Sequence, residues 1–154
     1  AYNYIVGQSA YSTNQSGGWQ FVINPEGKLS FTWCKLRDTS GDTPSWEWDQ
    51  ISGLYARNGQ WVHLVAAVEP LATSENAVKV SFYINGKYVA TKESSLINPL
   101  SNNKLSMGRL PKASLDKVEG LVHCDFLGVV DEFSMFSGRL TDDLIKELFE
   151  LGKP

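Results

Sequence analysis

The sequence predicts an all-β domain built as an antiparallel β-sandwich or jelly roll, with one short helix at its C-terminal end. Two observations predict this class. Short apolar or alternating runs are separated almost throughout by turns rich in Gly, Asn and Pro. Only the segment Thr141–Gly152 has the spacing of an amphipathic helix. With 154 residues, of which 42% are hydrophobic, the chain can form one domain with a sizeable core, and we read residues 1–154 as that domain.

The N-terminal half contains two expected hairpin partners and two further strands. Four strands are expected here: Gly18–Ile23, Lys28–Trp33, Trp46–Leu54 and Trp61–Val68. Asn24–Gly27 forms a turn, because its proline fixes φ and its glycine tolerates a positive φ. The polar stretch Arg37–Ser45 predicts a loop, and Asn58-Gly59 predicts a second turn.

The C-terminal half is expected to hold a hairpin, a short strand and a final strand. These four strands are Val78–Ile84, Lys87–Thr91, Lys104–Gly108 and Phe126–Phe136. Asn85-Gly86 between the first two is a strong hairpin signal, because both residues tolerate positive φ. Loops are expected at Glu69–Asn76, Leu96–Asn103 and Pro111–Gly120.

The final strand carries large apolar residues on both faces, which predicts a position in the middle of the fold. Phe126, Val130 and Phe136 are assigned to one face, and Leu127, Val129, Phe133 and Met135 to the other. The carboxylate of Asp131 in its centre then needs a partner.

The predicted helix has a capping residue, an acidic first turn and an apolar stripe. Thr141 can cap it, and Asp142 and Asp143 favour the positive end of the helix dipole. The stripe consists of Leu144, Ile145, Leu148 and Phe149. We expect this stripe to cover one face of the Phe126–Phe136 strand.

Charge and hydropathy exclude some classes of partner. The net charge is −3 and no basic stripe occurs, which argues against nucleic acid or an anionic membrane surface. No apolar run reaches the roughly 18–20 residues that span a bilayer, so no membrane insertion is expected. Two cysteines, Cys34 and Cys124, are either buried free thiols or one disulfide that closes a long loop.

Several segments resemble, in order, the LamG-like jelly roll of the concanavalin A-like lectin/glucanase superfamily. The matching segments are Gly18–Phe21, Gly27–Phe31, Trp61–Ala66, Phe82–Ala90, Leu105–Arg109, Phe126–Phe133 and Leu140–Ile145. The resemblance extends from about Tyr4 to Leu151. It implies a jelly-roll fold, but this fold carries lectins, carbohydrate-binding modules, adhesive domains and glycosidases alike.

The resemblance also implies a missing strand and a possible metal. Family members usually have one more strand before the segment matched by Tyr4–Gly7, so the chain is expected to be a piece that lacks this first strand. In related domains the residue that matches Asp131 often ligates a structural calcium ion with backbone carbonyls. The alternative is that Asp131 accepts backbone N–H groups of a neighbouring loop.

The preferred functional hypothesis is a non-catalytic carbohydrate-binding accessory domain of an extracellular or cell-surface protein. Trp46 and Trp48 share one face of their strand, where exposed indole rings would stack on sugar rings. The alternative is that one or both are core residues. The remaining predicted ligand-binding residues are Tyr11, Asn14, Asp42 and Arg109.

The other hypotheses are a structural or protein-interaction domain that packs on a neighbouring catalytic domain, and a glycosidase. Glu47 and Asp49 share a strand face, as a glycosidase carboxylate pair could. The glucanase branch needs a second Glu where this chain has Ser52 or Gly53, so catalysis is disfavoured. His63 and His123 lack a second cluster with metal-ligand spacing and are assigned structural or incidental roles.

Overall fold

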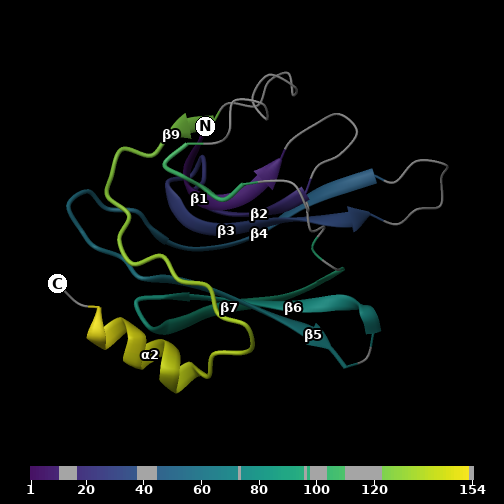
Figure 1. Ribbon diagram of the computed structural model, residues 1–154. Helices are drawn as coiled ribbons and strands as arrows, with labels where there is room; N and C mark the ends of the chain where they lie inside the picture. Colours follow the sequence, from purple (N-terminus) through teal and green to yellow (C-terminus); the bar gives the residue numbers. More distant parts are fainter. Residues whose placement is uncertain are drawn as a thin grey trace.

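The computed structural model describes residues 1–10, 17–37, 45–72, 74–95, 97, 104–109 and 123–152. At residues 10, 36–37, 45–46, 74–76 and 123–124 only the backbone is described. Two stacked sheets, with the single described helix beneath the smaller one, make up the molecule (Figure 1). The predicted antiparallel β-sandwich with one C-terminal helix is confirmed.

The larger sheet has six strands. They are β1 (Tyr2–Ala10), β2 (Gly17–Ile23), β3 (Lys28–Arg37), β4 (Ser45–Tyr55), β8 (Ser106–Met107) and β9 (His123–Asp125). The order is β4-β3-β2-β1-β8, and β9 pairs with β1 as the one parallel neighbour among the described strands. The turn between β2 and β3 is held by Asn24, whose Oδ1 accepts hydrogen bonds from the backbone N–H groups of Glu26 and Lys28.

The smaller sheet is a meander of β5 (Leu64–Leu71), β6 (Ser74–Ile84) and β7 (Lys87–Ser95). The predicted hairpin at Asn85-Gly86 is confirmed, since these residues have φ values of 53° and 71°. Both values fit a two-residue turn whose twist matches the flanking strands.

The core lies between the sheets and follows the alternation of the strands. Its fully buried members are Ile5, Val6, Leu29, Phe31, Trp33, Ile51, Val78, Val80, Phe82 and Ile84. A hydrogen bond of 2.9 Å from Trp33 Nε1 to Ser94 Oγ joins β3 to β7 across this interface. Leu29, Phe31 and Trp33 of β3 therefore face the core, and the residues that alternate with them face away from it.

Two predicted elements differ from the structure in the middle of the chain. The strand expected at Trp61–Val68 begins only at Leu64, because Trp61 precedes the pairing with β6 and is exposed. The loop expected at Glu69–Asn76 is wrong. Its polar residues lie in β5 and β6, which stay paired as far as Leu71 and Ser74.

The strand predicted at Phe126–Phe136 is also wrong, because residues 126–141 belong to no helix or strand. The segment runs along the side of the sandwich, from the larger sheet to the helix (Figure 1). Phe126, Val130 and Phe133 pack against the core, whereas Leu127 and Val129 are exposed. Glu132 has a φ of 50°, and this left-handed residue interrupts the alternation that the sequence suggested.

The helix α2 (Asp142–Leu151) is capped as predicted: Thr141 Oγ1 accepts the N–H of Leu144 at 3.3 Å. Its position differs from the expectation. Tyr83 Oη on β6 donates to Asp142 Oδ1 at 2.8 Å, and Phe149 stacks on His63 with ring centroids 6.0 Å apart. The stripe therefore covers the outer face of the smaller sheet instead of the Phe126–Phe136 segment.

Candidate binding face of the larger sheet

The outer face of the larger sheet carries buried side chains, most of them polar and uncharged. These residues alternate with the core residues of β2 and β3, so they point away from the smaller sheet. The buried members of this outer face are Tyr4, Ser9, Gln20, Val22, Ser30, Thr32 and Cys34. Outward faces of sandwiches usually carry solvated residues, and this one is instead covered and polar.

Hydrogen bonds link these side chains from strand to strand. Ser30 Oγ donates to Ser52 Oγ at 2.9 Å, and Ser9 Oγ donates to Gln20 Oε1 at 3.1 Å. At the far edge, the hydroxyls of Tyr4 and Ser106 are 2.9 Å apart. Burial of these groups is offset where each has a partner.

Thr32 lies in the centre of the face. Its side chain is 5% exposed, and no hydrogen-bond partner for Oγ1 occurs among the described residues. In register, it lies between Gln20 on β2 and Gln50 on β4. An unpaired buried hydroxyl costs about 1–3 kcal/mol.

The outer face becomes accessible along β4, at the edge of the sheet. Trp48 is opposite Cys34, Gln50 is opposite Thr32 and Ser52 is opposite Ser30. Trp48 and Ser52 are half-buried, and Gln50 is exposed. We call Trp48, Gln50 and Ser52 the β4 margin. Trp46 lies one alternation further along β4, and its side chain is outside the described part of the chain.

The carboxylates predicted beside Trp48 face the other way. Asp49 is 8% exposed and is bonded by Lys35 Nζ at 3.0 Å, by Lys92 Nζ from β7 and by the N–H of Gln50. Burial alone would raise the pKa of Asp49. The hydrogen bonds from Lys92, Lys35 and Gln50 outweigh that effect and hold the pKa below its usual value. Asp49 is therefore ionised, and its ion pair with Lys92 links the two sheets.

Gly53 occupies one of the two positions where the glucanase pattern would place its second carboxylate. A Cβ atom at this position would lie 2.4 Å from Ile84 Cδ1 and 3.3 Å from Val89 Cγ1. A glutamate at residue 53 would therefore clash with the core of the sandwich.

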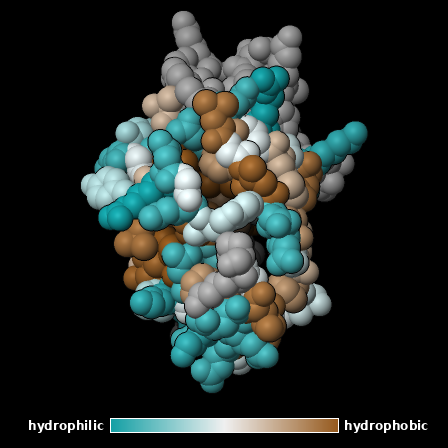
Figure 2. Space-filling model, turned by 90° about the vertical axis from the view of Figure 1, so that its left-hand side faces the viewer, coloured by the Kyte–Doolittle hydropathy of each residue, from teal (hydrophilic) through white to brown (hydrophobic). Residues whose placement is uncertain are grey.

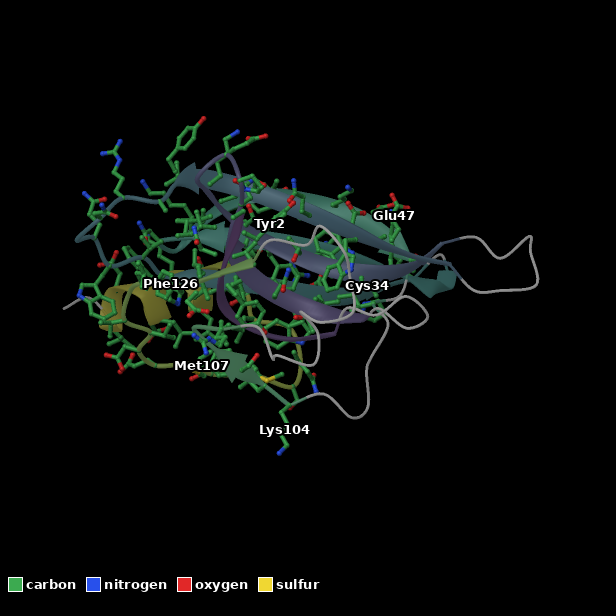
Figure 3. All side chains as sticks on the ribbon, turned by 90° about the horizontal axis from the view of Figure 1, so that it is seen from above. Tyr2, Cys34, Glu47, Lys104, Met107 and Phe126 are labelled. Atoms are coloured by element: carbon green, nitrogen blue, oxygen red, sulfur yellow. The ribbon has the colours of Figure 1, made fainter. Side chains whose placement is uncertain are left out.

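Of the other predicted ligand-binding residues, only Arg109 is described by the structure, and it does not join the β4 margin. Tyr11, Asn14 and Asp42 lie outside the described residues. Arg109 follows β8, and its guanidinium makes a two-pronged ion pair with Asp125, with Nε 2.9 Å from Oδ1. This hydrogen-bonded pair lowers the pKa of Asp125. β4 and β8 are opposite edges of the larger sheet, marked in Figure 3 by Glu47 and Met107.

Asp131 is exposed, and its Oδ1 accepts the N–H of Glu132 at 2.9 Å. Calcium takes six to eight oxygen ligands. Within the described ranges, no group of three or more His, Cys, Asp or Glu residues could hold a metal ion. Since calcium also accepts backbone carbonyl oxygens, calcium at Asp131 stays a prediction.

The cysteine alternatives are decided at Cys34, which is a buried free thiol. The disulfide alternative is thus wrong. Burial raises the pKa of Cys34 to about 12, which keeps the thiol protonated and unreactive. The side chain of Cys124, like that of His123, is outside the described part.

The site predicted from the sequence includes Trp48 but not Thr32, Gln50 and Ser52. The two β4 residues share the alternation of Trp48, and that signal was present in the sequence. The sequence alone does not single out Thr32, because its burial depends on the assembled sheet.

Comparison with protein families gives one match. The family model of the concanavalin A-like lectin/glucanases superfamily, of the laminin G type, matches residues 3–146. The chain belongs to this superfamily. No curated protein sequence and no solved structure matches this laminin G-like domain. In the described ranges, no helix has the length and apolar character needed to cross a membrane.

Proposed function

We propose that this laminin G-like domain is a non-catalytic carbohydrate-binding module of an extracellular or cell-surface protein. The observation that carries the proposal is the β4 margin. It places the half-buried Trp48, an exposed amide and a hydroxyl on one strand, in register with the hydroxyl row of β3.

The chemistry of the margin suits a neutral sugar. The Trp48 ring offers an apolar surface for the C–H face of a pyranose. The Gln50 amide can donate to one sugar hydroxyl and accept from another. The half-buried Ser52 hydroxyl would add a bond at the inner side of the same row. None of these groups is charged, which favours neutral over acidic glycans.

An immobilised glycan array, followed by calorimetry with the best hit, tests the proposal. We expect Trp48→Ala to weaken binding by about tenfold or more, as for a central aromatic anchor. Because Trp48 is half-buried, Gln50→Ala provides a second variant that keeps the fold, and it should weaken binding by about fivefold.

Tyr88→Ala is the matched control, since Tyr88 is an exposed aromatic residue on the other sheet. It should bind like the wild type. A glycan that binds Gln50→Ala and the wild type equally, or the absence of any array hit, would contradict the proposal.

A second candidate function is an interaction domain that packs on a neighbouring protein or catalytic domain. The exposed apolar side chains of Leu127–Phe136 favour it.

A further inference from the structure

Tyr55, the last residue of β4, lies on the same face of the larger sheet as the β4 margin. Tyr55 is opposite Lys28 in register, and Ser52 is opposite Ser30. Lys28 and Ser30 are two positions apart on β3 and point to one side, and opposite residues share a face. The Lys28 ammonium over the Tyr55 ring, 5.4 Å from its centroid, agrees with this placement. The outer row of β4 therefore has an aromatic residue at each end, Trp48 and Tyr55.

A β-bulge sets the positions of these two aromatic residues. Three steps along β4, from Ser52 to Tyr55, match two steps along β3. Strict alternation after Trp48 would turn Tyr55 toward the smaller sheet, and the extra residue of the bulge returns it to the outer face. The six remaining steps of about 3.3 Å place Trp48 and Tyr55 roughly 20 Å apart along the strand.

The Tyr55 ring is accessible and is held on one side only. The side chain is 62% exposed, although Lys28 lies over one face of the ring. Lys28 is itself held by the carboxylate of Glu26 at 2.8 Å, so this end of the strand carries a paired charge and not an excess of one sign. The ring can therefore offer its other face to the C–H groups of a neutral sugar.

Polar side chains lie between the two aromatic residues, along an open side of the sheet. Gln50 is exposed, and the Ser52 hydroxyl is fixed by Asn24 Nδ2 at 3.3 Å and by Ser30 Oγ at 2.9 Å. No described strand pairs with the other edge of β4. Glu47 marks the beginning of β4 in Figure 3. Figure 2 faces the side on which the chain leaves β4, and it shows hydrophobic side chains among hydrophilic ones there.

We propose that the β4 margin together with Tyr55 binds an unbranched, extended, neutral oligosaccharide, with one sugar ring on Trp48 and another on Tyr55. This proposal rests on the proposed function and names the class of its ligand. One sugar ring is much shorter than the distance between the two aromatic residues, so only a chain can contact both at once. The chain must be extended because the contacts follow a single strand, and a chain that coils would leave the strand before reaching the second ring.

Two series of extended β-1,4-linked oligosaccharides, one of glucose and one of mannose, are the probes. Calorimetry with each series, from the disaccharide to the hexasaccharide, measures how affinity depends on chain length. In at least one series the hexasaccharide should bind about tenfold or more tightly than the disaccharide, because the second aromatic contact becomes intramolecular. The hexasaccharide of α-1,4-linked glucose, which coils, should bind several-fold more weakly than the extended one.

Protein variants test the role of Tyr55. Tyr55→Ala should weaken hexasaccharide binding by about tenfold and should remove the gain in affinity over the disaccharide. Tyr55→Phe keeps the ring and should bind the hexasaccharide like the wild type. Tyr88→Ala is the matched control, because Tyr88 is a similarly exposed tyrosine of the smaller sheet, and it should change neither affinity.

Several results would overturn the proposal. These are no binding of either extended hexasaccharide, equal affinities for the disaccharide and the hexasaccharide, and equal hexasaccharide binding by Tyr55→Ala and the wild type. The proposed function can survive such a failure. If a glycan binds the wild type and is weakened by Gln50→Ala but not by Tyr55→Ala, the β4 margin binds sugar and only the extension to Tyr55 is wrong.

Discussion

The protonation of one residue, His63, affects the packing of the helix on the smaller sheet. Its backbone N–H donates to Asn85 Oδ1 at 3.0 Å, and its carbonyl accepts the N–H of Asn85 at 2.8 Å. The ring stacks on Phe149, and its Nδ1 is buried without a hydrogen-bond partner among the described residues. Burial lowers the pKa of His63.

This lowered pKa predicts a pH-dependent stability. Above the ordinary pKa of about 6.5, His63 is neutral in both the folded and unfolded states. As the pH falls through 6.5 toward the folded-state pKa, the unfolded chain takes up a proton first, and the free energy of unfolding decreases. Urea denaturation at about pH 7 and about pH 5 should show this loss for the wild type and a smaller one for His63→Gln. Identical losses in both proteins would contradict the assignment.

Calcium at Asp131 is the second prediction at the residue scale. If Asp131 ligates calcium, added calcium should raise the melting temperature of the wild type, and a chelator should reverse the increase. Asp131→Ala should abolish both effects. Differential scanning fluorimetry measures both effects. If neither calcium nor the chelator changes the melting temperature of the wild type, Asp131 does not bind calcium.

At the scale of elements, the β6–β7 hairpin and α2 are built on one another. The turn residue Gly86 has a φ of 71°, and a Cβ there would lie 3.0 Å from Phe149 Cδ1 and 3.3 Å from Lys146 Cα. Residue 86 must therefore be glycine for two reasons. The turn needs a positive φ, and the helix lies too close for a side chain. The Tyr83–Asp142 hydrogen bond fixes the other end of the helix, and with burial it raises the pKa of Tyr83 to about 12.

Gly86→Ala should therefore destabilise the domain by about 1–2 kcal/mol through the left-handed backbone and by about 1–3 kcal/mol more through the contact with the helix. Gly59→Ala is the matched control, because Gly59 has a φ of 72° but no described atom lies within 4 Å of the position that its Cβ would occupy. It should cost only about 1–2 kcal/mol from the left-handed backbone. Urea denaturation gives both values, and equal costs would show that the helix does not press on the turn.

The elements also show where sequence patterns were sufficient. The Asn85-Gly86 hairpin and the Thr141 cap each depend on residues within a few positions of each other, and both were predicted correctly. The Phe126–Phe136 segment was not, because apolar character on both faces does not reveal whether a strand lies alongside. Glu132 in a left-handed conformation moves Phe133 to the core side and leaves Phe136 exposed.

At the scale of the whole molecule, polar contacts across the layers supplement the apolar core. Asp49 on β4 binds Lys92 on β7, and Trp33 on β3 donates to Ser94 on β7. These contacts fix β7 beneath the β3–β4 side of the larger sheet. They also explain why the carboxylate pair suspected from the sequence is not free, since Asp49 is neutralised by two lysines.

Asp49→Ala should lower the free energy of unfolding by about 1–3 kcal/mol, because it leaves Lys35 and Lys92 without their shared acceptor. Glu47→Ala is the control on the same strand. Glu47 is exposed and 4.0 Å from Lys35, so its loss should change stability by no more than about 0.5 kcal/mol. Chemical denaturation measures both changes. If Asp49→Ala leaves the denaturation midpoint unchanged, the contacts of Asp49 do not stabilise the packing of the two sheets.

The candidate site was only partly predictable for a related reason. Trp48 stands out by its residue type, whereas Thr32 and Gln50 matter through their register across β3 and β4. Arg109 was grouped with Trp48 on chemistry alone, and the strand order places the two at opposite edges of the larger sheet.

The sequence by itself determined the strand periods, the hairpin turn, the capped helix and the superfamily, since each is recorded in residue types at short and fixed spacings. Only the tertiary structure decided three further points. The helix covers the smaller sheet, Asp49 faces lysines, and the segment Phe126–Phe136 stays outside both sheets. These outcomes depend on which groups that are distant in the sequence become neighbours in the fold. Periodicity predicts that an element has an apolar face, but it does not predict which other element packs against that face.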